Sequence, residues 1–166
     1  MAQEFSLGTV EVALSPIERF EEFLQSRGKR ITVQRRIIVQ QVARRHEHFD
    51  ADQLLADLAK TPDHRKVSRP TVYRTLAEMT EAGLLRKMDL SGRAVYEHDY
   101  GYPQHDHLYC QQCHKLIEFS SDDLLKLIDA VSREHQFRVL GHRFIITGQC
   151  ADCRRSRQAN RRLELV

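Results

Sequence analysis

The chain has 166 residues, of which 41% are hydrophobic, 26 are Lys or Arg and 23 are Asp or Glu. This composition suits a packed core, and no run approaches the roughly 18 uninterrupted apolar residues of a membrane-spanning helix. The first residues contain acids and lack the basic-then-apolar pattern of a secretion signal, so we expect a cytoplasmic protein with no membrane partner.

Signals for helix starts recur through the first half of the chain. Residues 1–14 show no clear period and are expected to form a flexible arm. Ser15-Pro16-Ile17-Glu18 then combines an N-cap serine, a proline in the first turn and a glutamate three residues after the cap. Similar capping residues open three further predicted helices, at Thr32, Asp50 and Ser68.

A short hairpin is expected after these helices. Two strand patterns, residues 84–88 and 94–97, flank the turn signal Ser91-Gly92. Helices followed by a two-stranded hairpin are the order of a winged helix-turn-helix, which we assign to residues 15–99. The fourth helix is basic at its start and rich in small polar residues, as suits a helix that enters a major groove. Its candidate DNA-facing residues are Ser68, Arg69, Thr71, Tyr73, Arg74 and Thr75.

The charges of the two halves differ. Residues 27–45 hold seven Lys or Arg and no acid, whereas residues 97–123 hold six acids and one Lys. This asymmetry indicates a phosphate-facing front half and a cation-binding back half, although two ordinary solvated faces would give the same pattern.

A second, smaller α/β domain is predicted for residues 105–153, after a hinge at residues 100–104. Strands are expected at residues 107–110, 115–119 and 138–147, with a helix opened by Ser120 or Ser121 between the second and third. Residues 154–166 are expected to form a basic tail. The fold class is therefore α+β.

The cysteines form two Cys-x-x-Cys pairs, Cys110 with Cys113 and Cys150 with Cys153. Each pair can direct two sulfurs at one ion, and four thiolates complete the closed tetrahedral shell of structural zinc. A redox dithiol would not explain the second pair, and disulfides are disfavoured in a chain without a secretion signal. The spacing therefore predicts a structural Zn²⁺ site.

A second cluster of ligand types precedes the first cysteine pair. His105 and His107 would project from the same face of a strand, and Glu97 and Glu118 end the strands on either side. Imidazoles with carboxylates form an open, harder site that suits Fe(II), Mn(II) or Zn(II). Single histidines elsewhere are expected to be ordinary surface or core residues.

At this point the sequence resembles the ferric uptake regulator family over about residues 15–153. The resemblance rests on residues 71–76 (TVYRTL), 82–84 (AGL) and 105–113 (HDHLYCQQC), and on the closing Cys150 pair. It implies homodimers that use bound metal to set two reading domains on a pseudo-palindromic operator in double-stranded DNA, and so to repress transcription.

The resemblance also implies particular site residues. The regulatory metal ligands would be His48, Glu97, His105, His107 and Glu118. Tyr73 and Arg74 would read the DNA, while Arg30, Thr32 and Arg35 would contact its backbone. A further metal site of some members is matched by Asp106 and His142. Gln104 stands there in place of a His and Leu125 in place of a Glu, with Asp122 and Asp123 nearby.

The regulatory metal is predicted to be Fe(II). Zinc-uptake regulators of this family often place a cysteine in the regulatory site, and this chain has none to spare. Peroxide-sensing members tend to have Asp at the positions of Glu97 and Glu118. Manganese, zinc or peroxide sensing on the same architecture are the alternatives.

An enzyme of another class is the remaining alternative, a metallohydrolase or deaminase built on His105-Asp106-His107. A zinc deaminase needs His-x-Glu followed by Pro-Cys-x-x-Cys. The chain has His-x-Asp, and no proline precedes either cysteine pair. We therefore expect no catalytic activity.

Overall fold

The structure is a computed structural model that describes residues 10–45, 47–62 and 67–155. The chain divides into two compact units between Pro103 and Gln104. Most of the predicted arm and basic tail, residues 1–9 and 156–166, lies outside the described residues. Among the helices of the described ranges, none is both long and apolar enough to cross a bilayer.

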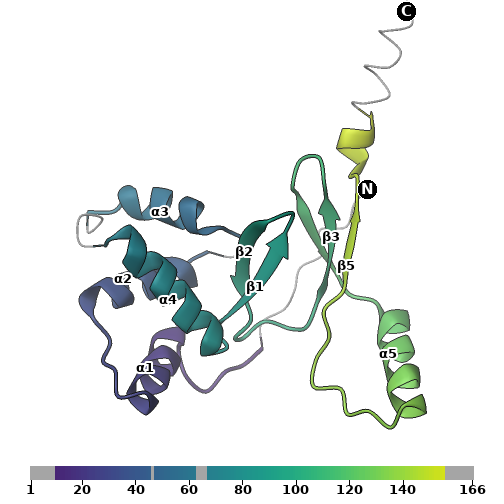
Figure 1. The fold of residues 1–166 in the computed structure, drawn as a ribbon, viewed down its shortest axis with the longest axis horizontal. Coiled ribbons are helices and arrows are strands. Elements are labelled where there is room, and N and C mark those ends of the chain that lie inside the picture. Colours follow the sequence, from purple (N-terminus) through teal and green to yellow (C-terminus); the bar gives the residue numbers. More distant parts are fainter. Residues whose placement is uncertain (1–9, 46, 63–66, 156–166) are drawn as a thin grey trace, which may run out of the picture. The chain divides into compact units, whose positions relative to one another are not determined.

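The first unit holds the helices and the hairpin in the predicted order (Figure 1). Its elements are α1 (Pro16–Ser26), α2 (Val33–Ala43), α3 (Ala51–Ala59), α4 (Arg69–Glu81), β1 (Leu85–Leu90) and β2 (Arg93–His98). The predicted caps are confirmed. Ser15 and Asp50 each form a capping box, and Thr32 and Ser68 accept a hydrogen bond from the backbone of their own first turns.

One apolar core joins these helices to the hairpin. Phe20, Leu54, Val72 and Leu76 are among its fully or almost fully buried side chains. Phe49 exchanges two backbone hydrogen bonds with Tyr96, of 3.0 and 2.7 Å, and so adds a short bridge to the edge of β2. The predicted winged helix-turn-helix is thus present, with α4 held between the other helices and the hairpin.

Residues 10–14 of the predicted arm contact the end of the same unit. The Val10 amide donates to the Gly101 carbonyl at 3.0 Å, and the Tyr100 hydroxyl donates to the Leu14 carbonyl at 3.1 Å. Gly101 has a φ of +79°, and a Cβ there would meet Val12 at 3.5 Å. Glycine is therefore favoured at this position by its backbone angle, since a Cβ would make only an ordinary contact with Val12.

The second unit is a small sheet with one helix. It contains β3 (Asp106–Cys110), β4 (Leu116–Phe119), α5 (Asp122–Glu134) and β5 (Ile145–Gly148). β3 lies in the centre, antiparallel to β4 and parallel to β5. The expectation of a strand over residues 138–147 is wrong for residues 138–144. Only residues 145–148 find partners along β3, from His107 with Ile145 to Cys110 with Gly148.

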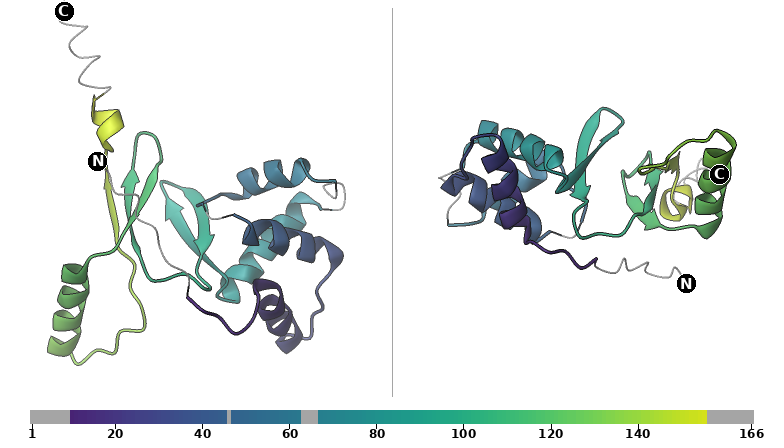
Figure 2. Two further views of the ribbon diagram at one scale, coloured as in Figure 1. Left: turned by 180° about the vertical axis from the view of Figure 1, so that it is seen from behind. Right: turned by 90° about the horizontal axis from the view of Figure 1, so that it is seen from below.

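Helix α5 is amphipathic but buries none of its residues within the chain. It lies beyond the ends of the strands, and residues 135–144 return from it to β5 as an extended connection (Figure 2). Several large apolar side chains of this unit are exposed, including Leu127, Phe137 and Leu140, the last of them 88% exposed.

Candidate metal centres and nucleic-acid interface

The four cysteines come together in the second unit because of the parallel pairing of β3 with β5. Cys110 ends β3, and its register partner Gly148 ends β5 two residues before Cys150. Cys113 lies in the turn after β3, and Cys153 in a helical segment of residues 151–155. All four Sγ atoms lie within 4.8 Å of one another.

This arrangement fits a zinc ion. A tetrahedral ion with Zn–S bonds of about 2.3 Å places neighbouring sulfurs about 3.8 Å apart. The Sγ atoms of Cys113 and Cys150 are 3.7 Å apart. The Cys113 and Cys150 amides lower the pKa of the Cys110 thiol to about 6. Burial, and then the neighbouring sulfurs, raise the pKa of Cys153 to about 12. Four thiolates therefore need a cation among them to be charged together.

The second candidate centre of this unit comprises His105, His107 and Glu118. Their ligand atoms lie within 4.8 Å of one another. His107 stands opposite Glu118 in the β3–β4 ladder, and the two imidazole rings meet edge to face with centroids 4.8 Å apart. His105 Nε2 lies 4.0 Å from Glu118 Oε1. Two atoms that each bind one ion at about 2.1 Å can be at most about 4.2 Å apart, so the spacing fits a first-row divalent metal.

Asp106 lies on the other face of β3 and is buried. Its Oδ1 accepts the Phe144 amide at 3.1 Å, and its Oδ2 lies 3.3 Å from His142 Nε2. Gln104 donates to the His142 carbonyl at 3.0 Å. The two residues assigned to a further metal site thus face each other. The third position, Leu125, is apolar and 49% exposed, and supplies no ligand.

His48 and Glu97 belong to the first unit, where they contact each other. His48 Nε2 lies 2.8 Å from Glu97 Oε2. The Glu97 carboxylate is buried, and Arg86 Nη1 lies 3.6 Å from its Oε1. Strand β2 ends at this point, so the pair stands at the edge of the hairpin. An imidazole and a carboxylate at this distance form a preassembled pair of metal-ligand types.

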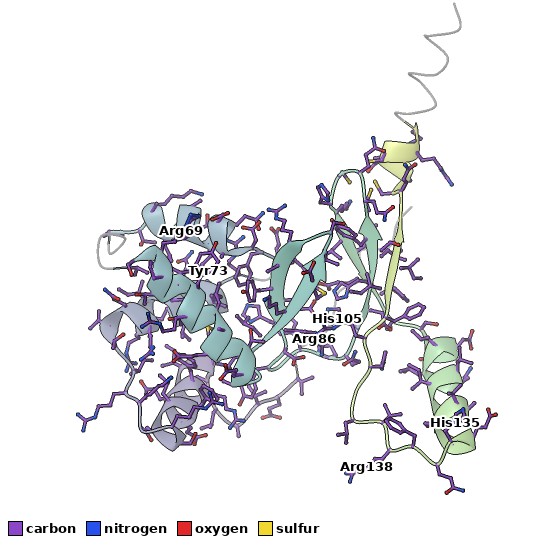
Figure 3. All side chains as sticks on the ribbon, in the orientation of Figure 1. Arg69, Tyr73, Arg86, His105, His135 and Arg138 are labelled. Atoms are coloured by element: carbon purple, nitrogen blue, oxygen red, sulfur yellow. The ribbon has the colours of Figure 1, made fainter. Side chains whose placement is uncertain are left out.

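Helix α4 exposes one face to solvent. Tyr73 is 46% exposed, Arg74 is also exposed, and Arg69 lies 5.9 Å above the Tyr73 ring (Figure 3). Ser68 caps the helix, and its Oγ lies 2.8 Å from the Thr71 hydroxyl. Thr71 in turn donates to the Gln34 side chain of α2 at 3.2 Å. An exposed aromatic ring between two arginines at a helix N-terminus is a surface suited to phosphates and base edges.

The three remaining DNA-contact candidates lie at the start of α2. Arg30 and Thr32 are exposed, and Thr32 caps the helix by accepting the Arg35 amide at 3.3 Å. The Arg35 side chain is only 15% exposed and is ion-paired with Glu78 of α4. The structure therefore places Arg35 between two helices.

Comparison with known proteins decides the family. The model of the ferric uptake regulator family matches residues 26–147. The chain belongs to this family. A ferric uptake regulation protein of Synechococcus elongatus is 37% identical to it over 136 residues, which cover 80% of this chain and 91% of that protein.

Solved Fur-family structures share the fold. The ferric uptake regulator Fur of Helicobacter pylori, described as having three functional metal binding sites, matches with a TM-score of 0.77 at 22% identity. The match covers 89% of this chain and 97% of that one. A zinc-bound manganese uptake regulator matches with a TM-score of 0.58 at 34% identity, covering 80% and 98% of the two chains. Fur-family proteins are metal-responsive transcriptional regulators, not enzymes, so the expected absence of catalysis agrees with the family.

Sequence reasoning missed one group that matters for the nucleic-acid interface of this Fur-family chain. Glu78 lies in the second half of α4, a helix whose first turns carry the DNA-facing candidates, and its side chain is only 7% exposed. A helical-wheel reading could have found it, because position 78 falls beside the buried positions 75 and 79. Its partners, Lys29 and Arg35, could not be inferred from spacing.

Proposed function

We propose that the chain is a metal-dependent, DNA-binding transcriptional repressor whose regulatory ion is Fe(II), and that it controls iron-uptake genes. The observation that carries this proposal is the cluster of His105, His107 and Glu118, two buried imidazoles and a carboxylate within ligand distance of one another. Such a donor set binds first-row divalent metals reversibly, as a sensor requires.

The proposed DNA-reading surface is the exposed face of α4. Tyr73 and Arg74 would meet base edges, with Ser68 and Thr71 at the helix N-terminus and Arg30 and Thr32 against the backbone. The solvent exposure of Tyr73, Arg74 and Arg30 supports this assignment. The operator is double-stranded DNA, and affinity should fall with salt because phosphate contacts release counterions.

A structural zinc ion is proposed to be bound by the four cysteines, Cys110, Cys113, Cys150 and Cys153. The bound ion supplies folding free energy here and no chemistry, because four sulfurs leave it no open position. The regulatory ion is proposed at His105, His107 and Glu118, and the sequence resemblance adds His48 and Glu97. Asp106 and His142 are proposed to form a hydrogen-bonded pair, so that each chain holds one regulatory ion.

The iron assignment has support from relatives, and so has one alternative. The Synechococcus elongatus relative is named a ferric uptake regulation protein. A manganese uptake regulator is 34% identical to this chain. Mn(II) accepts the same nitrogen and oxygen ligands as Fe(II), and is therefore the second candidate. Zn(II) and peroxide sensing through bound Fe(II) are further outcomes of the test.

The working form is proposed to be a homodimer on a pseudo-palindromic operator. Support comes from the exposed apolar side chains of the second unit, on α5, on residues 137–140 and on β5. An exposed apolar surface of this kind marks an interface. A two-fold dimer would also match the two half-sites of a palindrome.

The test is fluorescence anisotropy with a palindromic iron-box duplex, run anaerobically at fixed salt on zinc-loaded protein. Fe(II), Mn(II) and Zn(II) are titrated separately. We expect binding to appear with Fe(II) at the lowest free concentration, and to be lost in His105→Ala and His107→Ala. His135→Ala, an exposed histidine at the end of α5, is the matched control and should bind normally.

Each alternative has its own signature. Binding with Zn(II) alone would assign a zinc regulator, and a lower threshold for Mn(II) would assign a manganese regulator. Oxidation of His48 or His105 after peroxide treatment of the Fe(II) form, seen by mass spectrometry, would assign peroxide sensing. Tight binding by both histidine variants without added metal would refute metal dependence.

A further inference from the structure

An ion-pair network fastens one flank of α4 to α2 and to the segment that joins α1 and α2. The Glu78 carboxylate accepts Lys29 Nζ at 2.8 Å. Arg35 Nη2 lies 3.0 Å from Glu78 Oε1 and 2.9 Å from Oε2. The same Arg35 donates through Nη1 to the Arg30 carbonyl at 3.2 Å. One carboxylate thus binds two cations, and one guanidinium joins α4 to the backbone that precedes α2.

The two central members of this network, Glu78 and Arg35, have little contact with solvent, whereas Lys29 is half-exposed. The Glu78 side chain is 7% exposed and that of Arg35 is 15% exposed. A carboxylate taken out of water at this depth is tolerated only when charged partners and hydrogen bonds replace its hydration. An Arg side chain suits the position because its planar fork donates to the carboxylate through one nitrogen and to the carbonyl through another.

Glu78 is also close to the reading surface along the helix. It lies one helical turn after Arg74, on the same side of α4, and Arg74 is exposed beside the exposed Tyr73. A second acid of the same helix, Glu81, pairs with Arg27 at the start of the joining segment. The orientation of α4 in its unit is therefore set on one side by acids that bind basic residues 27–35.

We infer that Glu78 and Arg35 are positioning residues for the DNA-reading helix, and that the Arg35 charge is used inside the protein. This inference rests on the proposed DNA binding and replaces the backbone contact that the sequence resemblance implied for Arg35. Arg30 and Thr32 remain on the exposed surface for that role.

The two roles of Arg35 give opposite results for one substitution. If Arg35 positions α4, Glu78→Gln weakens DNA binding, by about ten-fold or more, because the helix loses its anchor. If Arg35 instead meets a phosphate, Glu78→Gln leaves binding unchanged or tightens it, because a competing carboxylate is removed. Binding is measured by anisotropy on the palindromic iron-box duplex with the metal-loaded full chain.

The salt dependence separates the roles a second time. Loss of one phosphate contact lowers the magnitude of the negative slope of log K against log salt by about 0.9. We expect Arg35→Gln to weaken DNA binding without changing this slope. The double variant Glu78→Gln with Arg35→Gln should bind DNA no more weakly than the weaker-binding of the two single variants. Arg36→Gln is the matched control, since Arg36 is exposed on the same helix and pairs with Glu21. A slope reduced by about 0.9 in Arg35→Gln alone would overturn the inference.

Two further measurements keep the outcome decisive. Should Glu78→Gln fail to fold, Arg35→Lys replaces it: a positioning role predicts weakened binding at unchanged slope, and a phosphate role predicts nearly normal binding. Amide hydrogen exchange of the DNA-free protein should accelerate in α4 for Glu78→Gln but not for Glu22→Gln, an exposed acid of α1. Equal exchange in these two variants would overturn the inference, whereas an unaltered chain that binds no duplex would overturn only the proposed function.

Discussion

The two units of the chain differ in what holds them together. In the first, buried apolar side chains from four helices and the hairpin form one core, from Phe20 to Tyr96. In the second, the buried apolar side chains among the described residues are Tyr109 and Cys110. Most of the large apolar side chains that are exposed in the described part of the chain belong to this second unit. Burial of apolar area within the chain stabilises the first unit more than the second, so we expect the proposed zinc ion and the proposed partner surface to stabilise the second.

The largest expected effect is therefore the removal of zinc. Structural zinc contributes about 10–16 kcal/mol of binding free energy to a small domain. A chelator that removes it, or the double substitution Cys113→Ser with Cys153→Ser, should unfold residues 104–153 and leave the first unit folded. Amide hydrogen exchange resolved by residue would show protection lost in β3 and β5 and kept in α2 and α4. Simultaneous loss of protection in both units would contradict the comparison.

A core substitution in the first unit should give the opposite pattern. Leu76 is fully buried, so Leu76→Ala should lower the free energy of unfolding of that unit by about 2–5 kcal/mol. Zinc content, measured by metal analysis, should be unchanged. Val33→Ala, on an exposed side chain of α2, serves as the control.

The exposed apolar surface of the second unit provides the third test. Leu140→Asp should raise the dissociation constant of the homodimer by about ten-fold or more, which corresponds to about 1.4 kcal/mol. Sedimentation equilibrium would measure it. Val33→Asp introduces the same charge on an exposed apolar residue of the first unit and should have no such effect. Unchanged dimerisation in Leu140→Asp would locate the interface elsewhere.

The smallest expected effect concerns the cap of α3. Asp50→Ala should destabilise the first unit by about 0.5–2 kcal/mol, because the Gln53 amide loses its acceptor. Burial raises the pKa of Asp50, but the Gln53 amide and Arg93 outweigh it, and the net pKa lies below 3.8.

This lowered pKa fixes the pH dependence of the Asp50 effect. A depressed carboxyl pKa means that the charged group stabilises the fold above pH 3.8 and that this contribution is lost as pH falls further. In urea unfolding, the difference in free energy of unfolding between the wild type and Asp50→Ala should therefore be constant near neutral pH. This difference should become smaller below pH 3.8. A difference in free energy of unfolding that grows in acid would contradict the lowered pKa of Asp50.

Local sequence signals predicted the helices and most of the strands, but they did not predict which distant segments pair with each other. Ser15, Asp50 and Ser68 predicted helix starts because a capping side chain bonds to the backbone within four residues, and the structure confirms these three caps. The expected strand at residues 138–147 is mostly wrong, because its length depends on how many partners β3 offers.

The candidate sites divide in the same way. Two Cys-x-x-Cys pairs and a His-x-His indicate their chemistry by spacing alone, and they lie in or next to strands β3 and β5. The pairing of Arg35 with Glu78, and of Asp106 with His142, joins residues distant in sequence whose contact depends on the packing of α2 on α4 and of residues 142–144 on β3. The family resemblance implied a metal site at Asp106 and His142 and a phosphate contact at Arg35, and only the tertiary structure shows which atoms these side chains meet.

The parallel position of β5 has a consequence for the newly made chain. β3 can form its antiparallel ladder with β4 as soon as the short turn between them is made, whereas its other edge waits for β5 and for Cys150 and Cys153, far along the chain. Contacts of high sequence separation close slowly, and helices with local contacts close early. During synthesis, the unit that contains α4, the proposed DNA-reading helix, is therefore complete before the four cysteines can come together. A nascent chain would carry this folded unit without yet having the complete four-cysteine centre proposed to bind zinc.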